Sequence, residues 1–244
     1  MNSIYLMREL NKKSTNHIKH SFISVNIFLI KVLQILLALI VLVNFAVSYA
    51  DEPGMALIPG GEFSSQTSKT PLHIDTFYID KTEVTQKSFI TIMGHANFFF
   101  KGDYHPAEQI NWFKAREYCE KTGKRLPTEL EWEKAAKGNV KTLFFWGNQP
   151  DASYAWFGGD YDLGHHPVGE KKPNSFGVFD TAGNVWEWTS TAQNEWNKTS
   201  SKNKIKLVAK GGAFNVSGHL IAPTSRMALN PKSRVFNVGF RCAK

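Results

Sequence analysis

The sequence lacks several features that would assign it to a familiar class. No long segment has helical periodicity and no segment repeats, which excludes coiled coils and solenoids. No flexible linker interrupts residues 51–244, so they are predicted to form one domain. Intrinsic disorder is also excluded, because 42% of the 244 residues are hydrophobic and 13% are aromatic.

Acidic residues are fewer than basic ones, and the chain carries a formal net charge of +8. The excess is uneven, because the first 50 residues hold five basic residues and one acidic residue. Residues 51–244 hold 24 basic and 20 acidic residues, which leaves a net charge of +4. They also contain no strip of basic and aromatic residues, so no nucleic-acid partner is expected.

An apolar run without charge occupies residues 32–47 and follows a basic stretch that ends at Lys31. Ser48, Tyr49 and Ala50 come next. The small residues Ser48 and Ala50, at positions −3 and −1, predict a cleavage site after Ala50. Residues 1–50 are therefore predicted to be a signal peptide, or an uncleaved signal anchor in which residues 22–47 contact the membrane. A buried core helix is the third alternative. No cysteine follows the run, which excludes a lipoprotein anchor.

The first two alternatives predict that residues 51–244 are exported to the periplasm, a secretory lumen or the extracellular space. Cysteine is scarce in this part, where Cys119 and Cys242 are the only two. In an oxidising compartment, two thiols favour a disulfide over a metal-binding pair or a nucleophile. Two separately buried thiols remain the alternative.

Capping residues and glycines predict three helices, and the last begins with a capping box formed by Thr128 and Glu131. The predicted helices cover residues 85–93, 112–122 and 128–137, and predicted strands cover 55–63, with a break at a Pro-Gly-Gly turn, and 74–80. Trp186 and Trp188 are two residues apart, so on an extended segment they share one face.

Two further patterns are ambiguous between structure and function. Gly211-Gly212 indicates a close backbone approach or positive φ rather than phosphate binding, because neither a helix nor Lys-Ser/Thr follows it. His165-His166 lies in a glycine-rich loop and predicts solvated side chains rather than a metal site. Among the histidines of residues 51–244, no two lie four residues apart on a predicted helix, as metal ligands on one helix would.

Eight blocks extend, in order, over most of residues 55–244, and one of them is Gly183-Asn184-Val185-Trp186-Glu187-Trp188-Thr189. The others are Phe77–Thr85, Gly123–Ala136, Phe145–Asn148, Pro167–Gly169, Asn174–Asp180, Lys210–Phe214 and Gly239–Cys242. In sequence and spacing these blocks closely resemble the formylglycine-generating enzyme family, also known as the sulfatase-modifying factor family.

The resemblance implies a single α+β domain with the family's C-type-lectin-like fold and little regular secondary structure. It also implies that Cys119 and Cys242 form a structural disulfide, since they match cysteines that the family pairs. A calcium site is implied at Asp180, Gly183, Val185 and Glu187, where two side chains and two backbone carbonyls would supply hard oxygen ligands.

The chain departs from the family at the copper site. The resemblance implies two copper-binding cysteines, five residues apart, between the Gly-Gly block and the last block. Residues 215–231 contain no cysteine, and their only softer ligands are His219 and Met227. Copper is therefore not expected here.

Two functions from different classes follow from these observations. The first is a non-catalytic exported factor that binds or matures a protein, peptide or glycan. The second is an oxidoreductase of the same broad family that acts on an unknown substrate with a different metal. The missing cysteine pair favours the first.

Overall fold

The computed structural model describes residues 30–37, 52–65, 70–159, 164–193 and 205–244. The chain divides into two units, Met1–Asp51 and Glu52–Lys244. In the first unit, residues 30–37 are helical and exposed. The rest of the predicted signal segment, including the expected cleavage site after Ala50, lies outside the described residues. Among the residues that were described, no helix has the length and apolar character needed to cross a membrane.

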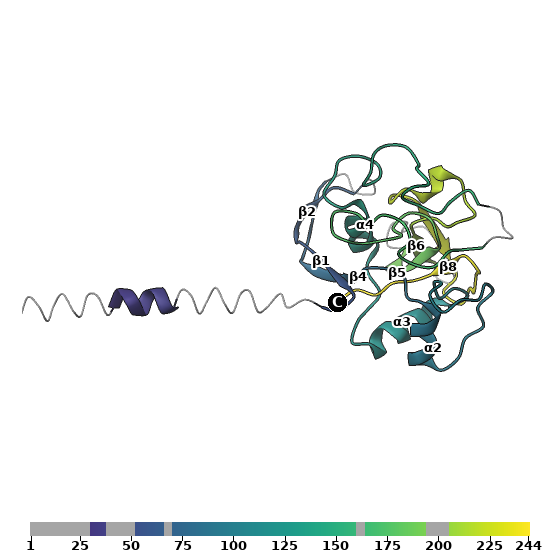
Figure 1. Ribbon diagram of the computed structural model, residues 1–244, viewed down its shortest axis with the longest axis horizontal. Helices are drawn as coiled ribbons and strands as arrows, with labels where there is room; N and C mark the ends of the chain where they lie inside the picture. Colours follow the sequence, from purple (N-terminus) through teal and green to yellow (C-terminus); the bar gives the residue numbers. More distant parts are fainter. Residues whose placement is uncertain (1–29, 38–51, 66–69, 160–163, 194–204) are drawn as a thin grey trace, which may run out of the picture. The chain divides into compact units, whose positions relative to one another are not determined.

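The second unit is an α+β domain in which short elements are separated by long loops (Figure 1). Two antiparallel pairs come first: β1 with β4, and β2 with β3. A four-stranded sheet follows in the order β7-β6-β5-β8. The strands are β1 (Met55–Ile58), β2 (Gly61–Phe63), β3 (Leu72–Ile74), β4 (Phe77–Asp80), β5 (Trp186–Ala192), β6 (Leu207–Lys210), β7 (Arg226–Leu229) and β8 (Val238–Gly239). The helices are α2 (Gln86–Met93), α3 (Trp112–Lys121), α4 (Glu129–Lys137) and the 3-10 helix η3 (Gly218–Ile221).

The three α-helices begin where the sequence predicts. Thr85 accepts a hydrogen bond from the backbone N–H of Ser88 at the start of α2. Asn111 caps α3 in the same way. Thr128 and Glu131 form the complete capping box of α4, with each side chain bonded to the backbone of the other. These local bonds satisfy helix N–H groups that would otherwise have no partner.

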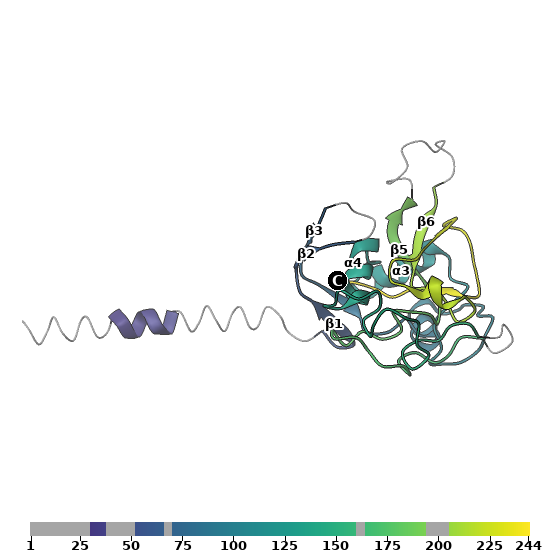
Figure 2. The ribbon, with the colours of Figure 1, turned by 90° about the horizontal axis from the view of Figure 1, so that it is seen from above.

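The four-stranded sheet has one apolar face and one charged face. Trp186 and Trp188 of β5 lie on the apolar face, as predicted, and pack in the main core with Phe89 of α2 and Tyr118 of α3. Glu187 has the opposite orientation and stands directly across from Lys210 of β6. Helix α4 packs against β5 and β6, and α2 and α3 lie together on the other side of the sheet (Figures 1 and 2).

The end of the chain returns to the beginning of the domain. Tyr78 and Lys244 exchange two backbone hydrogen bonds of 2.9 and 2.8 Å. The N–H of Asp80 donates to the carbonyl of Cys242 at 2.8 Å. The carboxyl end of the chain therefore lies next to β4 (Figure 1).

A disulfide joins Cys119 of α3 to Cys242 in this returning segment, with a Cα–Cα distance of 5.6 Å. This is the pairing that the family resemblance implies. Both cysteines are fully buried in the main core. The bond closes a loop with a sequence separation of 123 residues, so it restricts the unfolded chain strongly.

We predict that the Cys119→Ser/Cys242→Ser variant loses about 4 kcal/mol of unfolding free energy, because the unfolded chain regains the freedom that the long closed loop removes. Denaturant titration of wild type and variant measures the difference. Wild type reduced with dithiothreitol is the control and should unfold at the denaturant concentration of the variant. A variant as stable as the oxidised wild type would show that the bond has no stabilising role.

Candidate functional site

The segment from Asp180 to Val185, directly before β5, forms a buried loop with an unusual backbone. Asp180 and Asn184 both have positive φ, at 53° and 54°, which is uncommon for residues other than glycine. Gly183 also has positive φ, and a Cβ atom there would lie 1.9 Å from the carbonyl oxygen of Trp156. The loop can therefore be formed only with glycine at this position.

Asn184 holds this loop to several distant segments. Its Nδ2 donates to Glu83 Oε1 at 3.0 Å, and its Oδ1 accepts from the backbone N–H of His166 at 3.0 Å. Its own N–H donates to the carbonyl of Trp156, and its carbonyl accepts from the N–H of Phe214. Asn184 is fully buried, so these bonds satisfy all of its side-chain and backbone polar groups without water.

Glu187 forms a buried ion pair with Arg241 in which both side chains are inaccessible to solvent. Arg241 donates to both carboxylate oxygens, at 2.6 and 2.7 Å, and Trp132 Nε1 donates to Oε2 at 2.6 Å. The remaining guanidinium N–H groups donate to the carbonyls of Asp80, Lys81 and Phe179. Burial alone would lower the pKa of Arg241, but the Glu187 carboxylate outweighs it and raises that pKa.

Two further carboxyl groups, Glu83 and Asp180, lie close to this ion pair. Burial, then the charges of Asp180 and Glu187, raise the pKa of Glu83 well above its ordinary value. Burial also raises the pKa of Asp180, although a hydrogen bond from the N–H of Gly169 opposes the change. Glu83 Oε2 and Asp180 Oδ1 are buried and have no N–H donor among the described residues. A protonated Glu83 carboxyl donates a hydrogen bond to Asp180. A proton or a cation between them would offset their repulsion.

These oxygens bear on the expected calcium site. Asp180, Gly183 and Val185 belong to the buried loop, and Glu187 follows in β5. Both oxygens of Glu187 are already bonded to Arg241 and Trp132. Glu83, which sequence reasoning missed, supplies a buried oxygen without a donor. Hard carboxylate oxygens suit calcium. Asp180 and Glu83 thus offer two of the roughly six to eight oxygens that calcium takes, while Glu187 is bonded to Arg241 and Trp132.

Residues 211–222 form a packed segment with apolar side chains, in the region where the resemblance implies the family's copper-binding cysteines. Gly211 and Gly212 both have positive φ, and a Cβ atom on Gly212 would lie 2.6 Å from the carbonyl oxygen of Leu220, so the predicted close approach is confirmed. Val216 and Ile221 are five residues apart, and both pack in one apolar cluster with Phe144.

Neither His219 nor Met227, the two softer ligands of this region, belongs to the apolar cluster around Phe144. His219 is exposed on η3. Met227 lies on β7 and packs against the main core. Across the described ranges, no group of three or more His, Cys, Asp or Glu side chains has the geometry of a metal site.

The prediction that the side chains of His165 and His166 are solvated is wrong for His165, whereas His166 is half-buried. The side chain of His165 is fully buried, with Nδ1 3.0 Å from His105 Nδ1 and Nε2 3.8 Å from Glu108 Oε1. His166 stacks on Trp156 with ring centroids 3.5 Å apart. These partners are distant in sequence, so no local pattern could reveal them. Burial, followed by the neighbouring His165, lowers the pKa of His105 and favours its neutral form.

Most of the chain matches one known protein family. The model of the sulfatase-modifying factor enzyme 1-like domain matches residues 44–244. The chain belongs to the family of sulfatase-modifying factor enzyme 1-like domains.

Curated relatives of this family include proteins named as active and as inactive enzymes. The chain is 37% identical over 155 residues to the inactive C-alpha-formylglycine-generating enzyme 2 of Bos taurus, which covers 57% of this chain and 50% of that protein. It is 35% identical over 166 residues to the formylglycine-generating enzyme of Mus musculus, covering 57% of this chain and 44% of that protein. The match thus spans about half the length of these relatives.

Solved structures agree on the fold. Treponema denticola variable protein 1 has a TM-score of 0.67 and 24% identity, and covers 78% of this chain and 94% of its own. The domain therefore has the C-type-lectin-like fold of the sulfatase-modifying factor family, as predicted.

This family member also has a second buried charge cluster that sequence reasoning missed. Lys210, fully inaccessible, lies 3.3 Å from both Glu129 and Glu133 of α4. Arg226 of β7 pairs with Glu129 at 2.6 Å. Glu129 and Glu133 are four residues apart, so helical spacing places them on one face of α4. That shared face was a usable signal, because residues 128–137 were already predicted to form a helix.

We predict that Arg241→Met destabilises the domain by about 3–5 kcal/mol, because it leaves the Glu187 carboxylate buried without its charge partner. The comparison is Lys121→Met, which removes one partner of the exposed pair with Glu117 and should cost less than about 1 kcal/mol. Urea titration gives both values.

The double variant Arg241→Met/Glu187→Met should lose less stability than the sum of the two single variants, since it removes both charges together. An Arg241→Met variant no less stable than Lys121→Met would contradict the structural importance of the pair.

Proposed function

We propose that this protein is an exported, non-catalytic member of its family that binds or matures an exported protein, peptide or glycan. The observation that carries this proposal is the packing of Val216 and Ile221. They have the spacing of the family's copper-binding cysteines, but they contribute only apolar side chains to the cluster around Phe144. Both cysteines of the chain are joined to each other in a disulfide, so neither offers a thiolate.

Stacked aromatic rings in the loop next to the apolar cluster indicate that this loop is rigid rather than reactive. Phe144 and Trp146 stack with centroids 4.6 Å apart, and Trp146 and Tyr154 stack at 5.1 Å. The ammonium group of Lys172 lies 5.0 Å from the Tyr154 ring. These contacts order the loop beside the apolar cluster without regular secondary structure. The name of the inactive bovine relative is consistent with loss of catalysis on this fold.

The alternative, an oxidoreductase with another metal, would require a substrate-accessible set of ligands. His219 and Met227 are the softest donors of the region, and they lie in different environments, one exposed and one against the core. The binding function therefore has the stronger support.

We predict that the purified protein, incubated with copper, oxygen and a Cys-x-Pro-x-Arg peptide, leaves the peptide mass unchanged. The physical reason is that no free thiolate is present to hold copper(I) or to exchange with the substrate cysteine. Mass spectrometry of the peptide measures the outcome, with a protein-free reaction as the control.

The variant Val216→Cys/Ile221→Cys tests the interpretation of this segment. It restores two thiols at the family's spacing and should compete for copper(I) against a chromophoric chelator better than wild type does. Conversion of the peptide cysteine to an aldehyde by wild type, above the control rate, would overturn the non-catalytic proposal.

We also propose that Asp180 and Glu83 hold a calcium ion that stabilises the loop. Two buried carboxyl oxygens, Glu83 Oε2 and Asp180 Oδ1, have no N–H donor among the described residues, which supports this role. Calcium at a hundredfold excess over its dissociation constant should raise the unfolding free energy by about 2.7 kcal/mol, which differential scanning fluorimetry detects as a higher Tm.

The Asp180→Asn variant should lose this calcium response, whereas Asp151→Asn, which changes an exposed carboxylate, should keep it. An equal Tm for wild type in calcium and in EDTA would refute the calcium proposal.

A further inference from the structure

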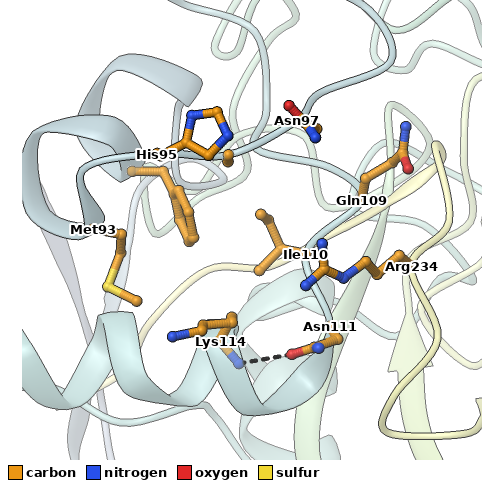
Figure 3. A pocket seen from close by; sticks show the side chains of 10 residues that line it. Met93, His95, Asn97, Gln109, Ile110, Asn111, Lys114 and Arg234 are labelled. Atoms are coloured by element: carbon orange, nitrogen blue, oxygen red, sulfur yellow. Dashed lines mark hydrogen bonds between the residues drawn. The ribbon is translucent and has the colours of Figure 1, made fainter.

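A cavity of about 170 Å³ lies between the end of α2 and the start of α3 (Figure 3). The side chains of Phe89, Met93 and Ile110 give it an apolar floor, and polar side chains surround them. Small-molecule sites commonly enclose roughly 300–1,000 Å³. The cavity therefore suits one residue or end-group of a larger partner rather than a complete cofactor.

The charges that line the cavity are positive. Lys114 and Arg234 contribute cations, and no aspartate or glutamate lines it. The ammonium group of Lys114 donates to Glu117 at 2.7 Å, so its charge is already paired. For Arg234, no carboxylate of the described residues is within ion-pair distance. A guanidinium group has five donors in a planar arrangement that matches a carboxylate.

Asn111 adds a second donor. Its Oδ1 accepts the N–H of Lys114 at 3.0 Å, so the group that it can still offer is the Nδ2 amide. Figure 3 shows the guanidinium of Arg234 next to Ile110 and Asn111. A ligand here would thus meet donors beside an apolar surface.

The backbone next to these donors is held in a strained conformation. Gln109 has a φ of 54°, in the left-handed region that residues other than glycine rarely adopt. Its N–H donates to the carbonyl of Val235 at 3.1 Å, which joins the segment before α3 to the residue after Arg234. Strain of this kind is concentrated at binding sites, where the surrounding structure maintains it.

We propose that this cavity binds the C-terminal carboxylate of a peptide whose last residue has a small apolar side chain. Arg234 and Asn111 Nδ2 donate to the carboxylate, while the side chain lies on Phe89, Met93 and Ile110. An internal Asp or Glu would leave the apolar floor without a partner, and an anionic sugar would place hydroxyl groups there. The inference deepens the proposed binding function, on which it rests for its partner class, but it uses none of residues 211–222.

The test is fluorescence anisotropy of the purified full chain with fluorescein-labelled Gly-Ser-Gly-Val, either as the free acid or as the C-terminal amide. The free acid should bind at least about tenfold more tightly than the amide, because a charge-assisted hydrogen bond is lost with the carboxylate. Arg234→Gln should weaken binding of the free acid by a similar factor.

Two further variants separate specific binding from general effects. Asn111→Asp keeps a good helix cap but replaces the amide donor with a negative charge, so the helix should remain stable while binding of the free acid is lost. Lys232→Gln removes an exposed charge two residues from Arg234, outside the cavity lining, and should change the affinity less than about twofold. Unfolding midpoints confirm that each variant is folded.

Equal affinities for the acid and the amide, or equal losses in Arg234→Gln and Lys232→Gln, would overturn the proposal. Arg234-dependent binding of glucuronic acid without binding of the peptide acid would also overturn it, since the occupant would then be an anionic sugar. Failure of the peptide to bind is distinguishable from failure of the non-catalytic proposal, because the peptide-oxidation assay reports on residues 211–222 alone.

Discussion

The buried ion pair between Arg241 and Glu187 connects parts of this domain that little regular secondary structure would otherwise hold together. Arg241 comes from the last residues of the chain, Glu187 from β5, and Trp132, which shares the Glu187 carboxylate, from α4. The same guanidinium donates to carbonyls at the end of β4 and in the loop before β5. Because every donor of a buried charged group needs an acceptor, the Arg241–Glu187 pair fixes how these five segments approach one another.

The charged face of the central sheet explains why α4 and the pair α2–α3 lie on opposite sides. Trp186 and Trp188 are directed to one face, where they bury apolar surface against α2 and α3. Glu187 and Lys210, opposite each other across β5 and β6, are directed to the other. There α4 contributes Glu129 and Glu133 to pair with Lys210. A helix with two acidic residues on its inner face can pack only against a surface that supplies cations to pair with them, as Lys210 does here.

The functional consequences of this arrangement differ between regions. Near Asp180 the rigid framework holds carboxyl oxygens that lack donors, which is a costly arrangement unless a proton or cation is bound. At residues 211–222 the same framework packs the apolar side chains of Val216 and Ile221 in the cluster with Phe144. The cavity beside Arg234 is formed by α2, α3 and the segment before β8, and it lies outside both regions. A fold can thus retain its framework while the sites that it supports change independently.

Local chemistry in the sequence determined the helix starts at Thr85, Asn111 and Thr128, the shared face of Trp186 and Trp188, and the need for glycine at positions 211 and 212. The motif blocks, by their resemblance, also implied the fold class and the cysteine pairing. These features could be predicted because caps, strand periodicity and glycine conformations depend on neighbouring residues. Only the tertiary structure decided that Glu187 is bonded to Arg241, that Glu83 joins Asp180, that His165 is buried beside Glu108, and that Arg234 lines a cavity with Asn111. Each of these depends on contacts between segments distant in the chain, where a polar side chain's role is set by burial and by the partner it meets rather than by its own residue type.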